Sequence, residues 1–516
     1  MDIGPIGRPA GQLTVGAAWI ESEPLDLRSL LPSLRGAGAP SLLWLVGISL
    51  AACSVGPNYM RPSAPTPSHF KEAKGWKLAT PLDTVDRGPW WSVYEDPKLA
   101  ALLSQVEISN QTVAAAVAAY QQALEIIKVA QAGLFPTVTN SYNVAGTHQG
   151  GNTTGFSTTS LTFNPVANAT WDIDVWGRVR RTVESSAAAA QVSAADLDNA
   201  KLSAQATLAT AYFGLLAADS LKALLERTAA SYRKTLEITR NQYKSGVVSQ
   251  ADVITAETQL LSTEAQAINV GVARAQYEHA IAVLIGKPPA ELTLMPGALA
   301  RNIPHIPVTI PSTLLERRPD IAATERALQQ QNALIGVAVA NFYPDISLTG
   351  MFGFAGATPL PISVAAEAWS LAGSATQTIF DGGLRRAELD AARASYRQSV
   401  AVYRQTVLTA FQQVEDELAA LRILAQQLKK EEAAVKAARQ AVQIYLNQYR
   451  AGTVAFTAVV TAEAIQLANE EAALSVRQSL FIASVALIEA LGGGWDSSLL
   501  PELENLSAVP TITPPL

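Results

Sequence analysis

One segment of this chain occurs twice, and the distance between the copies constrains the fold more than any other feature. Residues 241–257 (NQYKSGVVSQADVITAE) and residues 447–463 (NQYRAGTVAFTAVVTAE) are identical at nine of seventeen positions, at a spacing of 206 residues. The same spacing relates Gly286 to Gly492. Such a unit is much longer than a solenoid repeat of about 20–50 residues. We therefore predict an internal tandem repeat, and a pseudo-symmetric protomer whose symmetry an oligomer would extend.

Each repeat contains two segments that alternate as β-strands do. Residues 160–175 alternate between an apolar face, from Leu161 to Val175, and a polar face that includes Asp172 and Asp174. Residues 345–354 and 369–379 alternate in the same way in the second repeat. The first run is longer than an ordinary strand of about 5–6 residues and is typical of a membrane β-barrel strand. A soluble antiparallel hairpin in each half is the alternative that alternation alone leaves open.

A very long helix is predicted after each strand pair. Residues 178–244 and 384–450 contain no proline, and each has 67 residues, or about 100 Å of helix. We expect a shorter antiparallel helix after a glycine turn in each repeat (249–285 and 455–491), and a first helix over 97–134. A coiled-coil seam in the second long helix is predicted from apolar residues spaced by seven: Val400, Val407, Val414, Leu421, Leu428, Val435, Val442 and Tyr449.

The N-terminal region reads as an export signal. The apolar run 42–52 is shorter than the about 20 residues that a membrane-spanning helix needs, and fits a signal peptide. It ends at Leu50-Ala51-Ala52-Cys53, which resembles a bacterial lipobox, and Ser54 after the cysteine favours outer-membrane sorting. A chance cysteine is the alternative. The preceding stretch is acidic for a signal peptide, so we expect translation to start nearer Leu30.

Bulk properties argue against several functions. The net charge is −6 without a basic patch, which argues against nucleic acid as a partner. The only cysteine excludes an intramolecular disulfide. The four histidines (His69, His148, His279 and His305) show no metal-ligand spacing, and no phosphate loop or nucleophile elbow is present. We therefore expect no enzyme activity, no metal and no cofactor apart from a covalent lipid on Cys53. Asp172 and Asp174 are expected to line a lumen or a barrel rim.

Several phrases of the sequence carry a family resemblance that covers about residues 53–496. They are CSVGPNY, WWSVYEDPKLAALL, AGLFPTV, DVWGRVRR, both NQY-x-x-G segments and IPSTLLERRPDIAATE (310–325). The chain resembles outer-membrane efflux proteins of the TolC/OprM type, and within them the NodT-like lipoproteins. The resemblance implies a mainly α fold with a membrane β-barrel, in which long α-helical hairpins form a periplasmic α-barrel. It also implies a homotrimer, outer-membrane lipid around the barrel, a periplasmic adaptor (membrane fusion protein) and an inner-membrane pump of the resistance-nodulation-division (RND) class.

The strand number agrees with this assembly. Four strands cannot close a barrel, because the smallest single-chain membrane barrels have about eight strands. Three copies would supply a 12-stranded barrel; two copies would supply eight strands, which is narrow for a wide helical tube.

The resemblance places the functional residues at the hairpin turns. Gly246, Val247 and Val248, with Gly452, Thr453 and Val454, would rim the periplasmic aperture and meet the adaptor. The simpler reading is that each glycine only ends its helix. Asp252 is a candidate gate carboxylate, although Ser249 and Asp252 also have capping-box spacing. In the second repeat, Ala458 and Thr461 stand where related channels often carry aspartate. Glu257 and Glu463 are weak substitutes for these gate carboxylates.

We therefore predict a passive exit duct for small molecules, anchored in the bacterial outer membrane and extending into the periplasm. An outer-membrane duct for type I protein secretion and a structural coiled-coil lipoprotein without a pore are the alternatives. The predicted organisation is a signal peptide with its N-terminal extension (1–52), a lipidated linker (53–92), the first repeat (93–290), a Pro-rich segment (291–311), the second repeat (312–496) and a tail (497–516).

Overall fold

The computed structural model describes residues 54–72, 89–150, 155, 158–302, 304, 314–359 and 366–508. The predicted signal peptide, Cys53, the start near Leu30 and His305 lie outside the described residues. The helices are η2 (Trp90–Tyr94), α2 (Pro97–Ser109), α3 (Gln111–Ala132), α4 (Arg178–Lys244), α5 (Gln250–Leu284), η3 (Pro289–Glu291), α6 (Leu314–Arg317), α7 (Pro319–Ala340), α8 (Leu384–Arg450), α9 (Phe456–Ala490), η6 (Ser497–Leu499) and α10 (Leu503–Ser507). The strands are β1 (Thr137–Gln149), β2 (Thr158–Asp172), β3 (Asp345–Phe354) and β4 (Glu367–Thr376).

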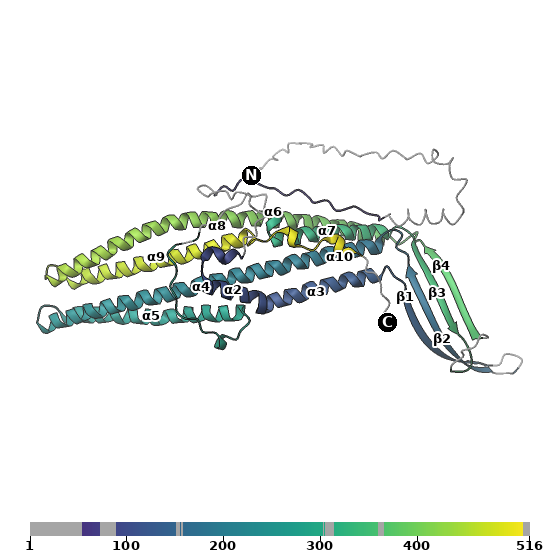
Figure 1. The fold of residues 1–516 in the computed structure, drawn as a ribbon, viewed down its shortest axis with the longest axis horizontal. Coiled ribbons are helices and arrows are strands. Elements are labelled where there is room, and N and C mark those ends of the chain that lie inside the picture. The colour runs from purple at the N-terminus through teal and green to yellow at the C-terminus, as the bar shows by residue number, and fades with distance from the viewer. Residues whose placement is uncertain are drawn as a thin grey trace, which may run out of the picture. The chain divides into compact units, whose positions relative to one another are not determined.

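Two helical hairpins follow the duplicated sequence. Helices α4 and α8 span 67 residues each, and both have the predicted bounds. Each packs against its shorter partner, α5 or α9, and the turns of both hairpins lie at the end remote from the strands (Figure 1). The predicted seam of α8 faces inward, since Val407, Val414, Leu421, Val442 and Tyr449 are buried and Val400, Leu428 and Val435 are partly buried.

The first helix differs from the prediction. Instead of one helix over 97–134, α2 and α3 meet at Asn110, whose backbone is extended. The Asn110 side chain accepts a hydrogen bond from Val113 N (3.0 Å) and donates one to Leu284 O (2.7 Å). An asparagine that caps a new helix competes with helix continuation, and this is the physical reason for the break.

The strands form one antiparallel sheet in the order β1-β2-β3-β4 within the described part of the chain. The cross-strand register keeps the same face of each strand on the same side of the sheet. On one face Val144 pairs with Phe163, Trp171 with Leu348 and Phe352 with Trp369. On the other face Asp172, Ser347 and Ser374 are aligned. The predicted apolar and polar faces are therefore confirmed, with Asp172 on the polar face.

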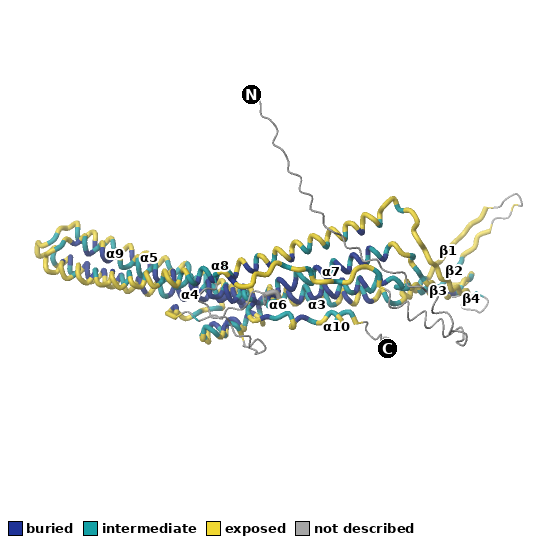
Figure 2. The backbone as a smooth tube through the Cα atoms, turned by 90° about the horizontal axis from the view of Figure 1, so that it is seen from above, coloured by how far each residue is buried: buried dark blue, intermediate teal, exposed yellow. Residues whose placement is uncertain are grey.

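The apolar face of the sheet is open to its surroundings, as the exposed strands in Figure 2 show. Its large apolar side chains are exposed together, whereas a soluble protein exposes apolar residues singly. Its exposed members are Val138, Tyr142, Val144, Leu161, Trp171, Leu348, Phe352, Trp369 and Leu371.

The passage from strand to helix corrects the prediction for Asp174. Strand β2 ends at Asp172, before the expected Val175. The carboxylate of Asp174 accepts hydrogen bonds from Val179 N (3.0 Å) and Arg180 N (2.9 Å), and pairs with Arg180 Nε at 3.2 Å. Asp174 therefore stabilises the first turn of α4 rather than lining a lumen. Asp381 repeats this arrangement with Gly383 N (2.9 Å) and Arg385 Nε (2.5 Å) at the start of α8.

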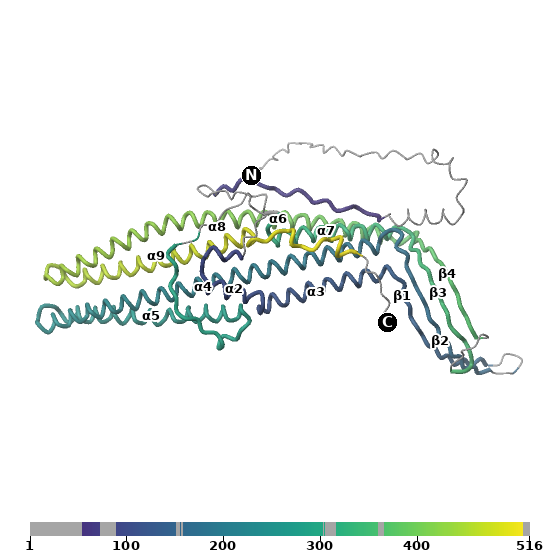
Figure 3. The backbone as a smooth tube through the Cα atoms, in the orientation of Figure 1, coloured from purple at the N-terminus to yellow at the C-terminus, as the bar shows by residue number. Residues whose placement is uncertain are grey.

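Residues 54–72 run as an extended segment along α7 and α8, as expected for this Pro-rich linker (Figure 3). The Arg181 side chain contacts Val55 O (3.2 Å), Gly56 O (3.3 Å) and Asn58 Oδ1 (2.9 Å). Val55 N donates to Trp176 O at 3.1 Å. Ser54, the first described residue, therefore lies where the strands pass into α4.

The Pro-rich segment after α5 forms a strap, here residues 289–302, on the first hairpin. Arg274 Nη2 donates to Leu294 O (2.6 Å), Leu294 N donates to Glu278 Oε1 (2.6 Å), and Gly297 N donates to Asp219 Oδ2 (2.9 Å). These bonds hold the described part of the Pro-rich segment against α4 and α5.

By length and composition alone, three described helices, α3, α4 and α9, are apolar enough to cross a membrane. Most of the apolar stretch of α4 that could span a membrane is buried inside the protein. Helix α4 would also exceed the bilayer core severalfold, since 67 residues span about 100 Å and the core about 30 Å. The open apolar face of the sheet is the surface better suited to lipid.

We expect Gly492→Ala to destabilise the fold more than Gly452→Ala. Both glycines have positive φ (90° and 73°), so alanine costs about 1–2 kcal/mol at either site. At Gly492 the added Cβ would also meet Arg317 O at 1.8 Å, whereas nothing lies within 4 Å at Gly452. Overpacking should add about 1–3 kcal/mol. Thermal loss of the helical circular dichroism signal measures this, and equal transitions for the two variants would contradict it.

Candidate functional site

The two hairpin turns have the same backbone structure. The Gly246 amide donates to Tyr243 O and the Val247 amide to Gln242 O, both at 2.9 Å, and Gly246 has φ +75°. The Gly452 turn repeats these bonds with Tyr449 and Gln448. This pattern is a Schellman motif, in which glycine takes the left-handed conformation that ends a helix. The prediction that these glycines terminate their helices is confirmed.

The side chains around the turns divide into two groups. Val247 and Thr453 are exposed, and Val247 exposes 67% of its surface. Val248 and Val454 pack instead against a cluster of buried residues. Among the six residues predicted at the aperture, Gly246, Val247, Gly452 and Thr453 therefore form the outer surface, and Val248 and Val454 support it.

This cluster, here the tip core, joins both hairpins. Tyr232 and Leu236 come from α4, Leu260 from α5, and Tyr449 and Phe456 from the second hairpin. The rings of Tyr449 and Phe456 lie 5.3 Å apart. The two turns are therefore held together as one rigid end, a suitable base for an exposed docking surface.

Asp252 takes part in a capping box. Its Oδ2 accepts hydrogen bonds from Ser249 N (3.0 Å) and Ser249 Oγ (2.8 Å), and its amide donates to Ser249 Oγ (3.3 Å). This satisfies amides at the start of α5. Its role at a gate stays a prediction. In the second repeat Ala455 and Ala458 replace Ser249 and Asp252, and α9 begins without a side-chain cap.

The equivalent glutamates of the two repeats have different surroundings. Glu257 forms a half-exposed ion pair with Arg240 at 3.2 Å. Glu463 is 5% exposed, and Thr235 Oγ1 of the other hairpin donates a hydrogen bond to it at 3.3 Å. Burial raises the pKa of Glu463 from 4.5 to about 7.

The sequence pattern does not predict the burial of Glu463, which is expected there only as a weak gate substitute. A signal was present: the residue 206 positions after Arg240 is Leu446, so the second repeat lacks the arginine that pairs with the equivalent glutamate.

The described residues contain no cluster of three or more metal-ligating side chains. His148 Nδ1 lies 2.8 Å from Thr159 Oγ1, and His69 Nδ1 lies 2.9 Å from Ser68 Oγ, both at exposed positions. The absence of enzyme activity stays a prediction.

The sequence matches the family model "Outer membrane efflux protein" over residues 102–287 and 310–493. The two matched parts correspond to the two repeats. The chain belongs to this family. It is accordingly an outer-membrane efflux channel that extends into the periplasm, and the family is one of channels rather than enzymes.

Individual proteins agree over most of the chain. The toluene efflux pump outer membrane protein TtgC of Pseudomonas putida is 28% identical over 86% of this chain and 93% of its own length. Nodulation protein T of Rhizobium leguminosarum bv. trifolii is 28% identical over 87% and 96%. The solved outer-membrane channel OprN has a TM-score of 0.80 at 30% identity, over 86% of this chain and all of that one. The fold expected from the sequence is thereby confirmed.

We expect the stability of the tip core to depend on pH through Glu463. Because the folded-state pKa (about 7) is raised above 4.5, the folded state binds more protons between these values. The contribution of Glu463 to the free energy of unfolding is then largest below pH 4.5. It falls as pH rises to about 7, by an amount of the order of 3 kcal/mol.

Glu463→Gln should flatten this dependence and raise thermal stability at pH 8. Thermal unfolding at several pH values measures it, with Glu257→Gln as the control because Glu257 is half exposed and paired. If the stability of Glu463→Gln fell with pH as steeply as that of the unaltered protein, Glu463 would not be the group responsible for the pH dependence.

Proposed function

We propose that this chain is the exit duct of a tripartite efflux system for small molecules. It would act as a homotrimer joined to a periplasmic adaptor and an inner-membrane RND-type pump. The observation that carries the proposal is a two-faced sheet with two free edges, connected directly to two helical hairpins of 67-residue helices.

The free edges support a trimer. Strands β1 and β4 each have one neighbour in the described sheet. Unpaired backbone groups in lipid cost several kcal/mol each, so these edges need strands from other copies. Three copies of a four-stranded sheet supply twelve strands, and β1 of one copy would pair with β4 of the next.

Small molecules are favoured over a secreted protein as cargo. TtgC is named for toluene efflux, and it matches 86% of this chain. A pore-free coiled-coil lipoprotein would need no membrane strands and leaves the open apolar face of the sheet unexplained.

Deletion of the gene tests the proposal. We expect accumulation of a fluorescent dye to rise in the deletion strain and to fall again when a plasmid copy is supplied. Unchanged accumulation, with outer-membrane location of the protein verified in the parent strain, would contradict multidrug efflux.

The exposed turn residues are proposed to contact the adaptor. We expect Val247→Asp with Thr453→Asp to abolish most dye efflux, because new charges on a docking surface are desolvated without partners. The amount of protein in the outer membrane should not change. Thr255→Asp, on an exposed part of α5, is the matched control. Full efflux by the double variant would show that the turns are not part of the docking surface.

Cys53 is proposed to carry the lipid anchor. Ser54, which follows Cys53 in the sequence, lies where the strands pass into α4, and this supports a lipid anchor on the cysteine. We expect Cys53→Ser to lose all incorporation of radiolabelled palmitate, while Ser54→Ala keeps it. Label retained by Cys53→Ser would exclude this site, since the chain has no second cysteine.

A further inference from the structure

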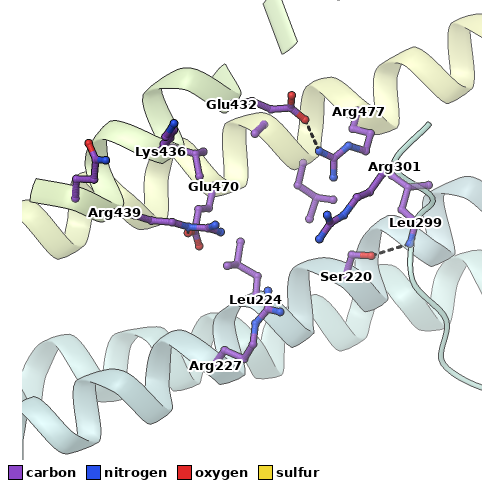
Figure 4. Close-up of a pocket in the computed structure, with 14 residues that line it drawn as sticks. Ser220, Leu224, Arg227, Leu299, Arg301, Glu432, Lys436, Arg439, Glu470 and Arg477 are labelled. Atoms are coloured by element: carbon purple, nitrogen blue, oxygen red, sulfur yellow. Dashed lines mark hydrogen bonds and ion pairs between the residues drawn. The ribbon is translucent and has the colours of Figure 1, made fainter. Parts of the chain in front are cut away.

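A pocket of about 540 Å³ lies where the two hairpins part, some distance from the turns. Its walls come from α4, from α8 and α9, and from the strap (Figure 4). The site described above uses none of the residues that line this pocket.

Positive charge predominates in this pocket. Its carboxylates, Glu432 and Glu470, are already neutralised: Arg477 Nη2 lies 2.9 Å from Glu432 Oε1, and Arg439 Nε lies 2.6 Å from Glu470 Oε1. The remaining charged lining residues are all cationic: Arg227 of α4, Arg301 of the strap and Lys436 of α8.

These three cations have no ion-pair partner among the described residues. The buried Nε of Arg477 also lacks a hydrogen-bond partner there. All three residues are exposed, so an anion from solution can reach them, and their like charges favour a counter-charge at the cleft. This excess of positive charge is local to the pocket, because the whole chain has a net charge of −6.

One hydrogen bond ties the strap to α4 near these cations. Leu299 N donates to Ser220 Oγ at 2.9 Å, two residues before Arg301. Arg227 follows Ser220 by seven residues, which is about two helical turns and places both on one face of α4. In Figure 4 the side chains of Arg227 and Arg301 extend into the space between the hairpins.

We propose that this pocket binds a small oxyanion with two or more negative charges, a phosphate or polycarboxylate group, between Arg227, Arg301 and Lys436. Guanidinium groups match the geometry of carboxylate and phosphate oxygens and bind them in a bidentate manner. The bound anion would connect both hairpins and the strap, and would therefore stabilise the helical part at this level.

Isothermal titration calorimetry on the purified, detergent-solubilised full chain tests the site. Inorganic phosphate and citrate are titrated separately, at constant ionic strength set with sodium chloride. The test variant is Arg227→Gln with Arg301→Gln. The matched control is Lys222→Gln with Lys234→Gln, which removes the same charge from exposed positions of α4 that do not line the pocket.

We expect saturable binding that the test variant weakens about tenfold or more, and that the control leaves within about twofold. Binding of phosphate alone would identify a phosphate ligand, and binding of citrate alone a carboxylate ligand. Absence of saturable binding by both anions, or equal weakening in the control, would overturn the proposal. Circular dichroism of each variant verifies that the helices are retained.

Discussion

The backbone hydrogen bonds of the sheet are the constraint on which the rest of the molecule depends. Lipid offers no donors or acceptors, so each strand in a membrane needs a neighbour on both sides. This sheet has an apolar face and a polar face in register over all its strands, yet it ends at β1 and β4. If strands from other copies closed this sheet into a barrel, the helices that follow the strands would stand side by side around the barrel axis.

Each hairpin depends in turn on the junction at which a strand becomes a helix. An aspartate and an arginine perform this function in both repeats, through Asp174 with Arg180 and Asp381 with Arg385. The carboxylate satisfies amides that a helix start leaves unpaired. Because the same pair recurs, both long helices begin in the same way, and their equal lengths bring both turns to the tip core.

The repeats have diverged where the two hairpins meet. The first has a capping box and an exposed Arg240–Glu257 pair, whereas the second has Ala455, Leu446 and a buried Glu463. The second hairpin thus contributes apolar surface and one protonatable group to the tip core. Farther from the turns the hairpins separate around a pocket with excess positive charge. The two hairpins are therefore joined by an apolar cluster at the tip core and part around a cationic pocket farther along.

The periodicity and the internal repeat of the sequence by themselves determined the long helices, the strand faces and the glycine turns. These features depend on local backbone preference and on the alternation of apolar residues, which are readable without knowledge of the fold. The break at Asn110 and the role of Asp174 depended on which backbone amides at the helix starts lacked partners. The burial of Glu463 and the placement of Arg227, Arg301 and Lys436 around one pocket were decided only by the tertiary structure. Each arises between segments far apart in the chain, and a pattern along one segment cannot report what another segment places beside it.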